Sequence, residues 1–268
     1  MSLPFEADPS CWEAPTFGDI LCRPIPEMGI GDRWLVRALA FLGRNQVRVL
    51  SGIEHVDPAN DPFILVLNHS TRREALLVPA ALILYRGGRL IHFLADWNFR
   101  LIPGIGLVYR RAQTITVTRK SARPSFLNLL KPLYREPLTV LERARSHLLA
   151  GMSLGIFPEA RVNRDRKRLL KGRLGAACLS LETGLSIVPA GIRLLDGAAK
   201  AGASAHLEIR IGAPLRPPHP VRTRAPIAEL RAWHAIVMAE IAHLSGKPWV
   251  YAKGDERCVT TPASPRAA

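Results

Sequence analysis

The chain has 268 residues, of which 48% are hydrophobic, and its formal net charge is +15. Its longest apolar run, 75–85, falls short of the ~20 residues that a membrane-spanning helix needs, so we expect a soluble or peripheral protein. Its four cysteines are scattered, which excludes a disulfide framework and predicts no metal site. The basic excess favours an anionic partner, such as a lipid surface or a phosphate-bearing ligand.

The N-terminal region is predicted to be peripheral. Residues 1–27 are rich in proline and acids, and no basic region followed by an apolar stretch marks a signal peptide. Residues 29–44 predict an amphipathic helix, with Trp34 and Leu42 near one face and arginines beside them. Such a helix can lie on a membrane or dock on the core, and its composition fits both. We assign 1–45 to this tail and helix.

The middle of the chain alternates short apolar runs with helical patterns. Continuous apolar strands between helices are typical of a sheet covered on both faces, so 46–252 is predicted to be one α/β domain. Its central sheet is expected to be largely parallel or mixed, with about seven strands. The predicted strands are 47–53, 63–67, 90–95, 114–117, 154–157, 187–192 and 207–211, and the predicted helices are 74–85, 138–150, 173–183 and 227–244. Residues 253–268 are predicted to be a flexible tail.

Residues 68–74 read Asn-His-Ser-Thr-Arg-Arg-Glu and lie between a predicted strand and a predicted helix. Residues five apart lie about 500° round an α-helix and face apart, so His69 and Glu74 meet only if the imidazole sits in the turn before the helix. The carboxylate would then hold Nδ1-H and leave Nε2 as a general base. The structural alternative is a histidine that only satisfies backbone groups at a helix start.

Three later segments follow this pair in a definite order. Residues 113–119 form a β-rich run that ends in an arginine, and 153–164 read Ser-Leu-Gly-Ile-Phe-Pro-Glu-Ala-Arg-Val-Asn-Arg, a strand followed at once by Glu159 and Arg161. Residues 181–192 are a helix end, a glycine cap and another strand. In order and spacing, these segments and 68–74 resemble the four sequence blocks of the glycerolipid acyltransferase family, which includes the lysophosphatidate acyltransferases.

Two positions depart from the family pattern. Members usually carry Asp where this chain has Glu74, and Gly where it has Ala160. The next residues, Arg161 and Val162, resemble the branch of the lysophosphatidylethanolamine acyltransferases and the transacylase tafazzin. The departures therefore leave the acceptor lipid more open than the reaction type.

The resemblance implies transfer of a fatty acyl group to the free hydroxyl of a lysophospholipid, with 1-acylglycerol-3-phosphate as the leading acceptor and phosphatidate as the product. His69 is the candidate base and Glu74 its orienting carboxylate. Arg119 and Arg161 are candidate phosphate ligands, because a guanidinium fork matches phosphate oxygens. By resemblance Glu159 binds the acceptor near its glycerol hydroxyls, and on physical grounds it could equally position Arg161.

The partners follow from the same reading. The acyl donor is expected to be acyl-CoA or acyl carrier protein, used as a substrate, with no separate cofactor or metal. An enzyme of this kind is expected to be cytoplasmic and peripheral on the inner face of an anionic membrane. The alternatives are an acyltransferase or transacylase that acts on another headgroup and a non-enzymatic member of the fold that binds lipids or anions.

Two rival functions have sequence features of their own. Between Arg100 and Arg173 there are 17 Lys or Arg residues against four acids, a charge excess that nucleic-acid binding would need. However, no aromatic residue lies between Phe157 and Trp233 to stack on bases, so no nucleic acid is expected as a partner. Residues 151–155 fit the Gly-x-Ser-x-Gly of serine hydrolases. Their serine follows a predicted helix and precedes a strand, the reverse of a nucleophile elbow.

Overall fold

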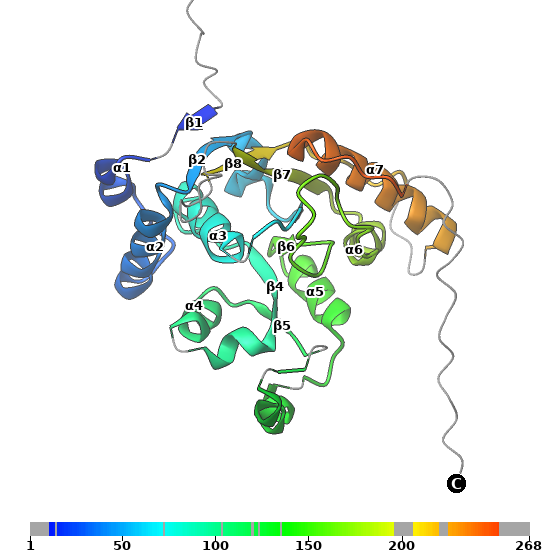
Figure 1. Cartoon of the computed structure of the whole chain (residues 1–268), viewed down its shortest axis with the longest axis horizontal. Coiled ribbons are helices and arrows are strands. Elements are labelled where there is room, and N and C mark those ends of the chain that lie inside the picture. The colour runs from blue at the N-terminus through cyan, green and yellow to red at the C-terminus, as the bar shows by residue number, and fades with distance from the viewer. Residues whose placement is uncertain are drawn as a thin grey trace, which may run out of the picture.

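The computed structural model of the chain describes residues 11–13, 15–71, 73–102, 104–118, 121–122, 124–134, 136–195, 206–219 and 225–251. In this part of the chain one mixed sheet has the strand order β1-β2-β8-β7-β3-β6-β4-β5, and helices lie on both of its sides (Figure 1). The strands are β1 (Cys11–Glu13), β2 (Val47–Ser51), β3 (Ile64–Leu67), β4 (His92–Asp96), β5 (Ile115–Val117), β6 (Leu154–Ile156), β7 (Ile187–Leu195) and β8 (His206–Ile211).

The seven strands predicted from the apolar runs are β2 to β8, so the predicted α/β architecture is confirmed. From β7 through β3, β6 and β4 to β5, neighbouring strands are parallel, whereas β8 is antiparallel to β7. The additional strand β1 pairs antiparallel with β2 at the edge of the sheet. Its three residues are too few to show a period in the sequence, so this strand was not predicted.

The helices are α1 (Phe17–Cys22), α2 (Ile30–Gly43), α3 (Glu74–Tyr85), α4 (Ile105–Arg111), α5 (Val140–Leu149), α6 (Gly175–Thr183) and α7 (Ile227–Ser245), with the 3₁₀ helices η1 (Ile53–Val56), η2 (Pro58–Asn60), η3 (Trp97–Leu101) and η4 (Ser125–Tyr134). In Figure 1, α3 lies on one side of the sheet and α5 and α6 lie on the other. Side chains of α6 and α7 share a buried cluster with β3, β6 and β7.

The central position of β3 in the sheet explains why its sequence is apolar throughout. Leu65 and Leu67 pack into the cluster formed with α3, and Ile64 and Val66 pack into the cluster formed with α6 and α7. All four side chains are fully buried, because successive strand residues face opposite sides and both sides are covered. A strand with one wet face would alternate apolar and polar residues instead.

Helix α2 docks on α3 and also presents apolar side chains outward. Val36 and Ala40 are buried in a cluster with Ile83 of α3, whereas Trp34 and Leu42 are exposed. One face of α2 therefore docks on the core, and contact of its exposed face with a membrane stays a prediction. Among the described residues, no helix is both long enough and apolar enough to cross a membrane.

Candidate active site

The turn after β3 is fixed to the sheet by Asn68. Its side-chain oxygen accepts a hydrogen bond from the Ile192 backbone N–H at 2.6 Å, and its amide nitrogen donates to the Ile192 carbonyl at 3.0 Å. Asn68 is buried, so both bonds are shielded from water. The carboxyl ends of β3, β4, β5 and β6 meet at this edge of the sheet, which is where α/β proteins place their ligands.

His69 and Glu74 meet at this edge across the start of α3. The imidazole stands in the turn, Glu74 is the first residue of the helix, and His69 Nδ1 lies 3.4 Å from Glu74 Oε2. The same oxygen accepts the Ser70 backbone N–H at 2.7 Å. Glu74 is fully buried, and the helix N-terminus favours its negative charge. Because Nδ1 faces this carboxylate, Nε2 is the ring nitrogen left for a ligand.

Phe157 and Glu159, which follow β6, hold the histidine from the other side. The Phe157 and His69 rings lie with their centroids 4.5 Å apart. Glu159 is buried, and its Oε2 accepts the His69 backbone N–H at 2.8 Å. Its Oε1 accepts the Leu170 backbone N–H at 2.7 Å and the Asn163 side-chain amide at 2.9 Å. Both oxygens of Glu159 are therefore bound to the protein itself.

Ala160 takes a backbone conformation that favours glycine. Its φ of +55° places it in the left-handed region, directly after Glu159 in the turn that follows β6. This conformation explains physically why a glycine suits the position, since a Cβ there crowds the backbone. The chain accepts an alanine here at a cost in strain.

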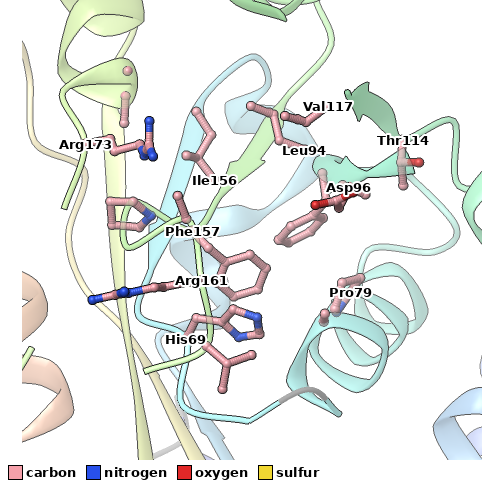
Figure 2. A pocket seen from close by; sticks show the side chains of 18 of the residues that line it. His69, Pro79, Leu94, Asp96, Thr114, Val117, Ile156, Phe157, Arg161 and Arg173 are labelled. Carbon is pink, nitrogen blue, oxygen red and sulfur yellow. The ribbon is translucent and has the colours of Figure 1, made fainter. Parts of the chain in front are cut away.

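A large cavity opens beside His69. Its volume is about 2200 Å³, and His69, Phe157 and Arg161 are among the residues that line it. Much of its wall is apolar and comes from α2, α3, α4 and β4, as shown by Leu35, Leu39, Leu76, Pro79, Leu94 and Val108. In Figure 2, Pro79 and Leu94 lie on one side of His69 and Phe157, and Arg161 and Arg173 lie on the other.

The cavity wall opposite Pro79 includes cations. Arg161 and Arg173 lie there in Figure 2, and Arg164, Lys171 and Arg231 line the cavity from the same segment and from α7, together with the acid Asp165. Neither Arg161 nor Arg173 forms an ion pair within the described ranges, so both guanidinium groups are available to an anion. Arg119, the other phosphate ligand predicted from the sequence, lies outside the described residues.

Ser153 does not have the surroundings of a nucleophile. It is buried at the start of β6, where its hydroxyl donates to Asp61 Oδ1 and accepts the Phe63 backbone N–H at 3.0 Å. Asp61 in turn accepts two hydrogen bonds from Arg86, each 2.8 Å long. The serine of the Gly-x-Ser-x-Gly motif thus belongs to a buried polar network that ties β6 to the loop before β3.

Sequence reasoning missed two residues near this site. Arg173 lines the cavity, and its backbone N–H donates to the Pro158 carbonyl at 2.8 Å, which fixes it beside the turn after β6. Lys247 follows α7, and its ammonium reaches Ser70 between His69 and Glu74. Neither residue lies in a recognisable pattern, because its place near the site depends on a contact between distant segments.

Comparison with known proteins is consistent with this geometry. The Acyltransferase family model matches residues 47–193, which include His69, Glu74, Glu159, Arg161 and Arg173. A search of curated proteins finds no match by sequence. Among solved structures, the crystal structure of the 1-acyl-sn-glycerophosphate (LPA) acyltransferase PlsC from Thermotoga maritima is similar, with a TM-score of 0.53 and 18% identity over 85% of this chain and 87% of that one. At this identity the likeness concerns the fold alone. The family match spans more than half of the chain, and the protein therefore belongs to the Acyltransferase family.

Proposed function

We propose that the protein transfers a fatty acyl group from acyl-CoA or acyl carrier protein to the free hydroxyl of a lysophospholipid, with 1-acylglycerol-3-phosphate as the leading acceptor and phosphatidate as the product. The observation that carries this proposal is the position of the His69–Glu74 pair. His69 of this pair lines a cavity of about 2200 Å³, with Arg161 and Arg173 on one side of it and apolar residues on the other (Figure 2). A lysophospholipid has the same division, an anionic headgroup beside a long apolar chain.

The pair supplies general base catalysis. His69 Nε2 accepts the proton of the acceptor hydroxyl while the hydroxyl oxygen attacks the thioester carbonyl. The tetrahedral intermediate then collapses, the C–S bond breaks, and the leaving sulfur takes the proton back from the imidazolium. Glu74 keeps the ring in the tautomer with Nδ1–H and stabilises the imidazolium between the two proton transfers. No acyl-enzyme forms on this route.

The cationic wall is proposed to bind the acceptor phosphate. Arg161 and Arg173 are unpaired within the described ranges and line the same cavity as His69, so their forks can each take phosphate oxygens. Arg119 remains a proposed third ligand on the strength of the sequence. The headgroup specificity is thereby assigned to arginines rather than to Glu159.

Glu159 is proposed to shape the part of the site that binds the acceptor by holding the segments around it in place. Its carboxylate joins three parts of that end, the His69 turn, Asn163 and the Leu170 backbone. Loss of this carboxylate would release the loop that carries Arg161 as well as the base. A direct contact with the acceptor would need Glu159 to give up one of these hydrogen bonds.

The proposal includes peripheral binding to the cytoplasmic face of an anionic membrane. Two elements support it. Ile30 and Trp34 of α2 are largely exposed, and Phe126, Leu129 and Leu133 of η4 are 65%, 83% and 78% exposed. Figure 1 shows α2 and, between β5 and α5, the η4 coil on the outside of the molecule. Exposed apolar groups of this size next to basic residues are typical of a surface that enters a lipid interface.

The deciding experiment is a panel of lysolipid acceptors that differ in headgroup, assayed with radiolabelled acyl-CoA and with acyl carrier protein. We expect product with lysophosphatidate and its loss in His69→Ala. Faster transfer to another lysolipid would reassign the headgroup. Tight binding of lysophosphatidate without product from any donor would instead favour the non-enzymatic alternative.

A further inference from the structure

Lys247 is a buried cation that enters the site from the far end of the described chain. Helix α7 ends at Ser245, and Gly246 takes a left-handed conformation with φ +67°, which turns the chain back toward the sheet. The Pro248 carbonyl accepts the Leu169 backbone N–H at 3.1 Å and holds this turn in place. Lys247 is only 6% exposed, which is unusual for a lysine unless its charge is compensated.

Its ammonium ends a chain of contacts that leads to the base. Lys247 Nζ donates to Ser70 Oγ at 2.7 Å, and the Ser70 backbone N–H donates to Glu74 Oε2 at 2.7 Å. That oxygen faces His69 Nδ1. Asn68 also donates to Ser70 Oγ, at 3.3 Å. Neither Lys247 nor Ser70 lines the cavity, so Lys247 is connected to His69 only through Ser70 and Glu74.

The surrounding charges explain why a buried lysine is tolerated here. Burial lowers the pKa of Lys247, while the carboxylates of Glu159, Glu74 and Asp165 raise it and Arg166 lowers it. Glu74 needs such a neighbour, because it is fully buried and its Oε1 has no hydrogen-bond partner among the described residues. A buried carboxylate without compensation would take up a proton and lose its charge.

We propose that Lys247 is a positioning residue for the acyl transfer, one that fixes Ser70 and places a compensating cation behind the buried carboxylate of Glu74. This inference rests on the proposed function, in which His69 is the base. A nearby cation favours a carboxylate over its protonated form and disfavours an imidazolium, so removal of Lys247 should change the pH dependence of the reaction.

The kinetic test replaces the charge with an apolar chain of similar length. In Lys247→Met we expect kcat/KM to fall about tenfold near neutral pH and the acid limb of its pH profile to move up by about one pH unit, since the chain of contacts that ends at His69 has lost its cation. Lys247→Arg should return the limb to its wild-type position. Lys167→Met changes an exposed lysine that does not line the cavity, and as the control it should leave the limb in place.

A second readout does not depend on turnover. The ring signals of His69, assigned with His69→Gln, can be followed by NMR as the pH is changed, and in Lys247→Met their midpoint should move to higher pH. If the wild type transfers no acyl group to any acceptor, the proposed function fails while this measurement still tests the coupling. Should Lys247→Met not fold, Lys247→Gln removes the charge and keeps a donor for Ser70. An unmoved acid limb together with an unmoved His69 midpoint would overturn the proposal.

Discussion

At the scale of single residues, the arrangement of His69 follows from the three groups that hold it. Glu74 faces its Nδ1, Phe157 lies against its ring, and Glu159 accepts its backbone N–H. The imidazole therefore has little freedom, and Nε2 points away from Glu74. A base held in this way needs no reorganisation when the acceptor binds, which is how preorganised sites lower a barrier.

Removal of the base gives the first prediction. His69→Ala should lower kcat by roughly 10² to 10⁴-fold, the usual contribution of a general base, with the unfolding midpoint little changed. Glu74→Gln should lower kcat more than Glu74→Asp, because Gln loses the charge that stabilises the imidazolium, whereas Asp keeps it one methylene further away. Steady-state kinetics of the three variants checks this. Equal activity of Glu74→Gln and the wild type would remove the orienting role.

The second prediction concerns the phosphate. Arg161→Ala and Arg173→Ala should each raise the KM for lysophosphatidate about ten- to a hundredfold, since each loses charge-assisted hydrogen bonds of roughly 1.5–3 kcal/mol. The KM for a neutral monoacylglycerol should change little, and Arg161→Lys should recover only part of the loss. Arg166→Ala, in the same loop but away from the cavity wall, is the control. Equal losses on the two acceptors would mean that these arginines do not bind the phosphate.

At the scale of elements, two irregular segments matter most for the proposed function. They are the turn between β6 and α6 and the 3₁₀ helix η4. The turn carries Glu159 and Arg161 to the edge where β3 ends, and Ala160 between them takes a left-handed backbone conformation. Helix η4 is held through Tyr134, whose ring lies 5.6 Å from that of Trp97, while its apolar side chains remain exposed.

The strain at Ala160 yields a stability prediction. Ala160→Gly should raise the free energy of unfolding by about 0.5–1 kcal/mol. The strain energy of a left-handed alanine is removed, and it exceeds the cost of the extra entropy that glycine has in the unfolded chain. Urea unfolding measures the difference. The control, Ala239→Gly on an exposed position of α7, should lower stability by about 1 kcal/mol. A loss of stability in Ala160→Gly would show that the turn holds its conformation without strain.

The exposed leucines of η4 predict membrane binding. Leu129→Glu and Leu133→Glu should each weaken binding to vesicles of phosphatidylglycerol and phosphatidylcholine about tenfold, since burial of a leucine contributes roughly 1.5–3 kcal/mol. Vesicle sedimentation checks this. Leu149→Glu changes an equally apolar and 66% exposed position at the end of α5 and should have little effect. A similar loss in that control would point to general electrostatic repulsion rather than to insertion of η4.

At the scale of the whole molecule, the layers bring the proposed catalytic pair, the cations and the apolar wall to one sheet edge. Parallel pairing of β3 with β6 and β7 places the ends of three distant segments next to one another, and α2 closes the apolar side of the cavity by docking on α3. One cavity in the described part of the chain thereby has a charged part and an apolar part, the division that the headgroup and acyl chain of the proposed acceptor also have.

The local sequence determined the seven strands β2 to β8 and helices such as α3, because an apolar period depends only on neighbouring residues and on which faces are covered. It also predicted that His69 and Glu74 meet, because they lie close together in the chain. Tertiary structure alone decided that Arg173 and Lys247 lie near the site and which face of α2 docks on the core. Their positions depend on which distant segment packs against them, and no spacing along the chain records a contact between residues 70 and 247.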